Sequence, residues 1–106
     1  MRFADKVFLL RFEDGSGLLL HLELQLEGDP DMPIRIAEYS AMLLRTIRKH
    51  QVPFSCMVIY LDPKVYREDP GEVVLVGPYD WKFCLNYRVV KLWEMDPEPI
   101  RLCLGI

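Results

Sequence analysis

The stretch Leu18-Leu-Leu-His-Leu-Glu-Leu-Gln25 decides how the rest of the chain is arranged. Its even-numbered positions are all leucine, so a strand here has one face that is apolar throughout. The other face reads leucine, histidine, glutamate and glutamine, and it becomes polar only at its end. A buried polar group without a partner costs about 1–3 kcal/mol. We therefore expect Glu23 and Gln25 to have partners, and their oxygen atoms suit part of a site for a hard cation.

Length and composition predict one folded domain that spans residues 1–106. Of the 106 residues, 51% are hydrophobic and 27% are charged, which is ordinary for a globular protein and argues against disorder. A chain of this length can build one core of sheet and helix. No apolar run approaches the roughly 20 residues that span a membrane, and the N-terminus lacks the pattern of a signal peptide. We therefore expect a cytoplasmic protein without a membrane partner.

Charge and reactive side chains narrow the function classes. The formal net charge of −3 lacks the clustered basic excess that is usual for nucleic-acid-binding proteins. Cys56, Cys84 and Cys103 are widely spaced and contain no C-x-x-C pair, so we expect reduced, buried thiols rather than a disulfide framework or a zinc site. His21 and His50 have no triad partner nearby in the sequence, and a structural role is expected for both.

The residues before the central stretch predict a β-hairpin. Residues 3–13 are rich in aromatic and aliphatic side chains, as in a strand, and the turn residues 14–17 follow them. Residues 18–25 then form the returning strand. The hairpin therefore pairs the first two strands of the chain in antiparallel fashion.

The length of the hairpin loop decides which side chains share a face, because a shift by one residue turns the whole strand over. A three-residue loop, Gly15–Gly17, with Gly17 in the left-handed conformation, would place Asp5 on the face of Glu23. A two-residue turn at positions 15–16 would place Asp5 on the opposite face. The sequence does not decide between these two loop lengths.

The pattern after the hairpin predicts one main helix and further strands. Apolar residues recur at helical spacing over residues 33–49, with Asp31 as the expected N-cap. Residues 54–61 are almost continuously apolar, which favours a buried strand parallel to residues 18–25, with the helix as the crossover. Further strands are expected at residues 72–76 and 82–93, and a short helix at 100–104. The predicted fold class is α/β: a mixed sheet of about five strands with a hairpin, one main crossover helix and a short C-terminal helix.

Five residues share a recognisable order, with an acid in the first strand, a Glu-x-Gln at the end of the second and a helix with Arg and Tyr four apart: Asp5, Glu23, Gln25, Arg35 and Tyr39. In this order they resemble the PD-(D/E)XK nuclease superfamily, and more narrowly the Rpn-type recombination-promoting nuclease/putative transposase family of bacteria. Residues 58–62, 87–90 and 92–94 match later strands of the family. The resemblance runs over most of the chain and implies a restriction-endonuclease-like core.

Carried over to this chain, the resemblance implies that Asp5 and Glu23 bind Mg²⁺, or Mn²⁺, beside a scissile phosphate of DNA. Such a cation polarises the phosphate and lowers the pKa of an attacking water. Gln25 takes the catalytic position where most of the superfamily has lysine, although an amide lacks the positive charge of lysine. Arg35 is implied as a phosphate contact and Tyr39 as a ligand-orienting residue. From the residues alone, the competing interpretation is a polar strand end with a packed tyrosine beside an exposed arginine.

The resemblance thus implies a metal-dependent DNA endonuclease related to transposon and recombination proteins. The sequence departs from the family at both ends, because relatives usually carry an upstream helix with a further acid and continue beyond the C-terminal end. The chain begins four residues before Asp5, which suggests truncation at the N-terminus. The alternative prediction is a catalytically inactive relative that acts as a dimerisation or protein-interaction domain, with a homodimer as its assembly. An open sheet edge or an apolar patch would serve such a partner.

Overall fold

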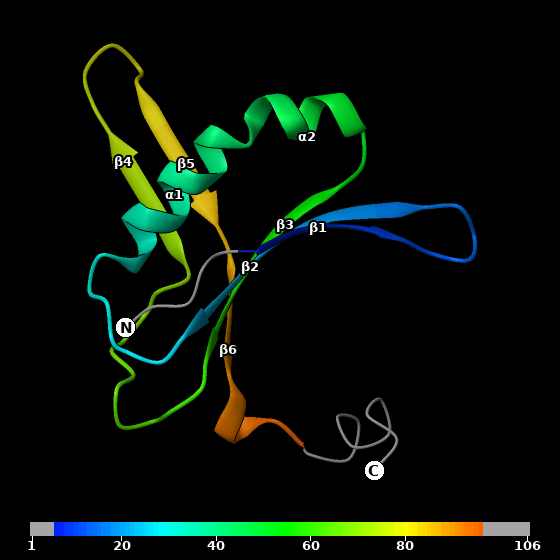
Figure 1. Cartoon of the computed structure of the whole chain (residues 1–106). Coiled ribbons are helices and arrows are strands. Elements are labelled where there is room, and N and C mark those ends of the chain that lie inside the picture. Colours follow the sequence, from blue (N-terminus) through cyan, green and yellow to red (C-terminus); the bar gives the residue numbers. More distant parts are fainter. Residues whose placement is uncertain (1–5, 97–106) are drawn as a thin grey trace.

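The structure is a computed structural model of the chain and describes residues 6–96. Within this range, six strands and two helices follow one another, and a single 3-10 turn ends the series (Figure 1). In chain order these elements are β1 (Lys6–Arg11), β2 (Gly17–Gln25), α1 (Met32–Met42), α2 (Leu44–His50), β3 (Phe54–Tyr60), β4 (Glu72–Val76), β5 (Lys82–Asn86), β6 (Arg88–Lys91) and η1 (Leu92–Glu94).

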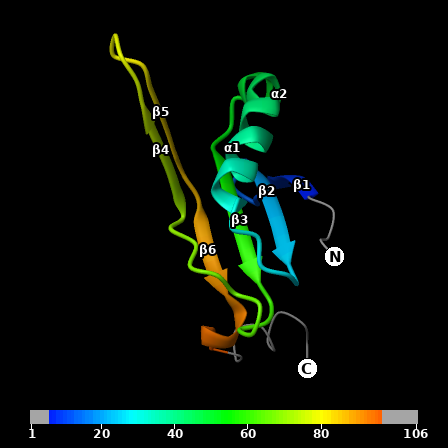
Figure 2. The same ribbon diagram turned by 90° about the vertical axis from the view of Figure 1, so that its left-hand side faces the viewer.

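The main sheet has the strand order β1-β2-β3-β6. β1 is antiparallel to β2, whereas β2, β3 and β6 run parallel to one another. The two helices connect β2 to β3, as a parallel pair requires. The predicted hairpin, helical crossover and parallel strand are therefore confirmed, in a mixed α/β fold. The prediction of about five strands in one sheet is wrong, because over residues 6–96 the sheet has four strands and β4 and β5 form a separate antiparallel pair. Figure 2 shows this pair standing apart from the main sheet.

The predicted helix over residues 33–49 is divided in two. Leu43 separates α1 from α2, with φ −90° and ψ −2°. Its N–H donates to the carbonyls of both Tyr39 and Ser40, each at 3.1 Å, so the backbone tightens at this point. The apolar spacing continues across the break, and for that reason the sequence pattern predicts one helix.

The predicted strand over residues 82–93 is also divided. β5 ends at Asn86 and pairs with β4, whereas β6 begins at Arg88 and pairs with β3. Tyr87 lies between them, and its N–H donates to the carbonyl of Gly71 at 2.9 Å. The chain therefore changes sheets at Tyr87. The strand expected at residues 72–76 is confirmed, and the short helix expected at residues 100–104 lies outside the described residues.

The hairpin loop differs from both expected forms. The register pairs Lys6 with Leu22 and Arg11 with Gly17, which leaves residues 12–16 as the loop. Gly17 belongs to β2, and the left-handed residue is Gly15, with φ 89°. Because this loop also has an odd number of residues, odd-numbered residues of β1 and β2 share a face. That is the parity which the three-residue loop required, although Asp5 itself lies outside the described residues.

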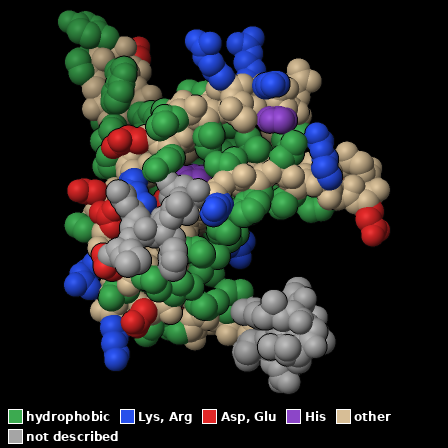
Figure 3. All heavy atoms as spheres, in the orientation of Figure 1, with side chains coloured by type: hydrophobic (Ala, Val, Ile, Leu, Met, Phe, Trp, Pro, Cys, Tyr) green, Lys and Arg blue, Asp and Glu red, His purple; other side chains and the backbone are tan. Residues whose placement is uncertain are grey.

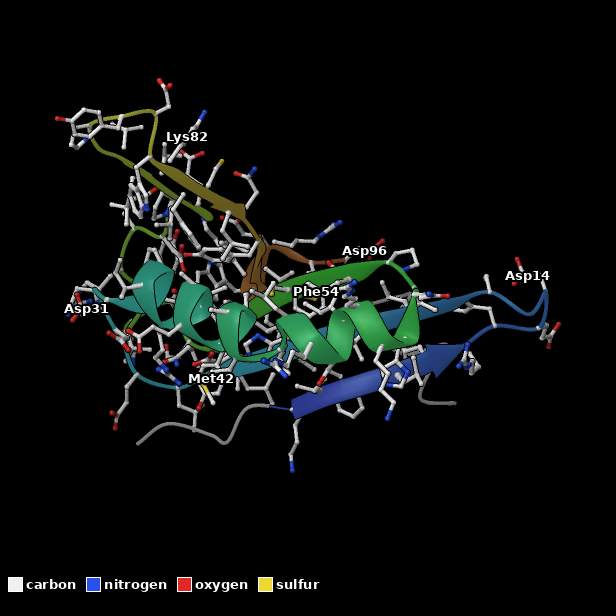
Figure 4. The ribbon with its side chains drawn as sticks, turned by 90° about the horizontal axis from the view of Figure 1, so that it is seen from above. Asp14, Asp31, Met42, Phe54, Lys82 and Asp96 are labelled. Carbon is white, nitrogen blue, oxygen red and sulfur yellow. The ribbon has the colours of Figure 1, made fainter. Side chains whose placement is uncertain are left out.

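The two faces of the main sheet differ in cover. On β2 and β3, every second residue is at most 4% exposed: Leu19, His21, Glu23, Gln25, Cys56, Val58 and Tyr60. The residues between them are partly exposed. Met32 and Ile36 of α1, both 0% exposed, pack in the same core. Figure 4, in which Asp31 and Met42 mark the two ends of α1, shows the helices lying across the strands. The face that carries the polar residues is therefore the face under the helices.

Two further predictions meet the structure here. No helix among residues 6–96 is long and apolar enough to cross a membrane. Cys56 and Cys84 are both free thiols, but Cys84 is exposed, so the expectation that it is buried is wrong. Cys84 belongs to the separate β4–β5 pair, where one face has little cover. Cys103 lies outside the described residues.

Candidate functional site

Four of the five residues that the sequence predicts for the site belong to β2 and α1. Glu23 and Gln25 occupy neighbouring positions on the helix-covered face of β2. Arg35 and Tyr39 lie one turn apart on α1, and both line a hollow of about 430 Å³ at the surface. The fifth residue, Asp5, lies outside the described residues.

Glu23 is fully buried, and its carboxylate contacts Arg35 and Gln25. The Nη2 atom of Arg35 forms an ion pair with Glu23 Oε1. The side-chain amide of Gln25 donates from Nε2 to the same oxygen at 3.2 Å. A buried carboxylate is costly unless it is paired with a charge and hydrogen-bonded, so these two contacts explain how Glu23 is accommodated. The expectation that Glu23 and Gln25 have partners is confirmed.

Arg35 links Glu23 to a second carboxylate. Its Nη1 atom lies 3.0 Å from Asp29 Oδ2, and its side chain is only 12% exposed. The planar guanidinium can hold two carboxylates at once through its separate N–H groups. Arg35 is therefore a cation shared between the end of β2 and the loop that follows. The competing interpretation of Arg35 as an exposed surface residue is wrong.

The loop before α1 places Asp29 in this arrangement. The Oδ1 atom of Asp29 accepts the backbone N–H of Asp31 at 2.9 Å, which fixes a tight turn before the helix. The other carboxylate oxygen is then directed to Arg35. Asp31 occupies the expected N-cap position but makes no side-chain capping bond. The sequence analysis missed Asp29, although its place two residues before the cap was a signal for such a turn.

His21 and Tyr39 pack together beside this group. Their ring centroids are 5.3 Å apart and the ring planes are tilted by 41°. His21 is fully buried on the same face of β2 as Glu23. Tyr39 therefore contacts the sheet with one side of its ring while it also contributes to the wall of the surface hollow.

A second polar cluster, which the sequence analysis also missed, lies on the same face of the sheet. The hydroxyl of Tyr60 donates to Asp69 Oδ2 at 2.5 Å, and the hydroxyl of Tyr87 donates to the other oxygen of the same carboxylate. The N–H of Asp69 in turn donates to the hydroxyl of Tyr66 at 3.3 Å. These bonds hold the long loop between β3 and β4 against the core.

Burial raises the pKa of both Tyr60 and Tyr87 well above the usual value of 10.0. The hydrogen bonds to Asp69 and its negative charge raise both pKa values further. The negative charge of Glu23 also raises the pKa of Tyr87, so the two polar clusters interact electrostatically. Both hydroxyls are therefore held as proton donors.

The side chains around Glu23 have the donor chemistry of a hard-cation site. Carboxylate and amide oxygens are ligands that Mg²⁺ accepts, and Glu23, Gln25 and Asp29 supply both kinds. Among residues 6–96, no group of three or more His, Cys, Asp and Glu side chains is arranged to hold a metal ion. The guanidinium of Arg35 lies between the two carboxylates, where it supplies the positive charge. A metal ion at Glu23 would therefore compete with Arg35 for the same oxygen.

The chain was compared with family models, curated proteins and solved structures, and none of them matches it. The resemblance to the PD-(D/E)XK superfamily therefore stays a prediction.

Proposed function

We propose that this chain is a PD-(D/E)XK nuclease-like domain, with a restriction-endonuclease-like core, that hydrolyses phosphodiester bonds of DNA with Mg²⁺ or Mn²⁺. One observation carries the proposal. Glu23 and Gln25 end the second strand of a hairpin on the face under the crossover helix, and Arg35 of that helix contacts Glu23. The order of hairpin, helical crossover and parallel strand supports it, because this is the order that the resemblance implies.

In this proposal, Glu23 and Asp5 would hold the metal ion, and Gln25 positions the carboxylate of Glu23 through its Nε2 atom. The ion, when bound, supplies positive charge beside the phosphate and lowers the pKa of the attacking water. The amide oxygen of Gln25 is an acceptor that can orient a proton of that water. Tyr39, at the wall of the surface hollow, is positioned to orient the substrate.

Arg35 has to change partners for the site to work. In the structure it neutralises Glu23 and Asp29 together. It also lines the hollow beside α1, so a phosphate group that enters the hollow offers it a new anionic partner. Release of Glu23 by Arg35 would then free the carboxylate for the metal ion. We therefore assign Arg35 to substrate binding as well as to neutralisation of Glu23 and Asp29.

Nicking of supercoiled plasmid DNA with Mg²⁺ or Mn²⁺ tests this function. We expect the wild-type protein to nick the plasmid, and Glu23→Gln to abolish nicking because it removes the metal-binding charge. Glu38→Gln is the matched control, since Glu38 is an exposed acid on the rim of the same hollow and makes the same change of charge. Equal nicking by Glu23→Gln and the wild type would contradict the proposal, as would an inactive wild type.

A further inference from the structure

β1 is an edge strand of the main sheet. Within the described part of the chain it pairs only with β2, so the backbone groups along its outer side meet no other strand. Such a row of N–H and C=O groups is a template for pairing with another strand. In Figure 4, β1 lies at the border of the ribbon, and neither helix extends beyond it.

The composition of β1 leaves this edge without the usual protection. Val7, Phe8 and Leu9 are 43%, 41% and 38% exposed, and the only charged residues are the two at the ends of the strand. Natural proteins commonly guard an edge with lysine, proline, a bulge or a short strand. The opposite edge, β6, follows that rule, because it has only four residues and a positive charge at each end. The two edges of the sheet therefore differ in what they can bind.

We propose that β1 binds a second copy of this chain, by antiparallel β1–β1 pairing across a twofold axis perpendicular to the sheet. An antiparallel edge is self-complementary under such an axis, so one strand supplies both halves of the interface. The pairing would join the two main sheets into one continuous sheet. It rests on the edge alone and does not depend on the nuclease activity proposed above.

The sequence of β1 fits a second copy. Side chains directly opposite each other must point to the same face of the sheet. One residue of β1 therefore has to lie directly opposite its own copy, with the twofold axis midway between the two. Centred on Leu9, the pairing brings Phe8 opposite Leu10. Centred on Phe8, it brings Val7 opposite Leu9. In neither register does Lys6 meet Arg11, so the like charges that would oppose assembly are kept apart.

The pairing also extends the apolar surface of the sheet. Phe8 and Leu10 share the open face of the sheet with the leucines of β2. A twofold axis perpendicular to the sheet keeps the open faces of both copies on one side and the helices on the other. Apolar side chains on both faces of β1 would then be covered by the partner, and this burial favours association. Figure 3 shows hydrophobic side chains along the hairpin of β1 and β2.

The molar mass of the full chain in solution, measured by light scattering across a wide range of concentration, tests this interface. We expect the wild type to approach twice the 12.5 kDa of one chain as concentration rises. Leu9→Lys and Phe8→Lys place charge in the middle of the edge and should each return the mass to 12.5 kDa. Val76→Lys is the matched control, since Val76 is 74% exposed on β4, and it should remain dimeric.

Hydrogen exchange of the β1 amides in the wild type gives a readout that does not depend on how the variants fold. Protection of these amides should increase with protein concentration, because the paired strand donates its outer N–H groups to the partner. A wild type that stays at 12.5 kDa throughout overturns the proposal. A dimer in which the β1 amides gain no protection overturns it as well.

Discussion

At the scale of single residues, Arg35 connects the acidic residues of the site. One guanidinium lies between the carboxylates of Glu23 and Asp29, and the first of these is fully buried. The three charges form a unit, since removal of Arg35 would take a paired cation away from a buried carboxylate. The stability of the fold and the chemistry of the site therefore depend on the same side chain.

We expect Arg35→Ala to lower the free energy of unfolding by about 3 kcal/mol, because it removes the guanidinium that pairs with the buried carboxylate of Glu23. Urea denaturation followed by circular dichroism measures this loss. Arg45→Ala is the control, since Arg45 is exposed on α2 and its replacement should change the free energy by no more than about 0.5 kcal/mol. Similar effects of the two substitutions would contradict the role given to Arg35.

The tyrosine cluster predicts a loss of stability at alkaline pH. Burial and Asp69 raise the pKa of Tyr60 and Tyr87 in the folded state above the usual value of 10.0. The stabilisation is therefore complete below pH 10.0 and decreases as pH rises above it, because the unfolded chain releases these protons first.

We expect Tyr87→Phe to make the decrease in unfolding free energy at alkaline pH less steep, because phenylalanine has no hydroxyl that titrates. Only Tyr60 would then contribute to the decrease. Tyr79→Phe should leave it unchanged, since Tyr79 is fully exposed. Denaturation curves at a series of alkaline pH values measure both slopes. The same slope in Tyr87→Phe and the wild type would count against the cluster.

The sequence predicted some residues of the site better than others. Glu23 and Gln25 could be placed on one face because strand alternation depends only on counting by two. Arg35 could be placed on the helix, but its pairing with Glu23 could not, since the contact depends on how α1 lies over β2. Asp29 and Asp69 come from loops, where no periodic pattern indicates the direction of a side chain.

At the scale of elements, the helical connection is more irregular than its sequence indicates. The 3.6-residue pattern passes through Leu43 without interruption. The helix is nevertheless interrupted at this residue, and α2 continues only from Leu44 to His50. The strand pattern likewise passes through Tyr87, where the chain leaves one sheet and enters the other. Periodicity reports which side of an element is apolar, and it does not report where the backbone hydrogen bonding changes, locally at Leu43 and through the bond to Gly71 at Tyr87.

The end of α2 offers a test at this scale. Gln51 follows the helix in the left-handed conformation, with φ 54° and ψ 33°, and its N–H donates to the carbonyl of Ile47 at 3.3 Å. Glycine adopts this conformation without the clash of a Cβ atom. We expect Gln51→Gly to raise the free energy of unfolding by about 0.5–1 kcal/mol, measured by thermal or urea denaturation. Gln51→Ala should give no gain, and an equal gain there would contradict this explanation.

At the scale of the whole molecule, the two faces of the main sheet differ in their side chains. The face under the helices holds the polar residues of the site, and the other face carries the partly exposed leucines of β2. Pairing through β1 would use the border between these faces and leave the hollow beside α1 open. A dimer of this kind is compatible with either function predicted from the sequence, the nuclease or the interaction domain.

Calorimetric titration with Mn²⁺ tests the central claim most directly, which is that Glu23 is the carboxylate of a metal site from which Arg35 can be displaced. We expect the wild type and the control Glu38→Gln to bind Mn²⁺ with similar affinity, and Glu23→Gln to show no binding, because the amide lacks the charge that holds the cation. Binding that survives in Glu23→Gln would contradict the claim, and so would a wild type that does not bind Mn²⁺.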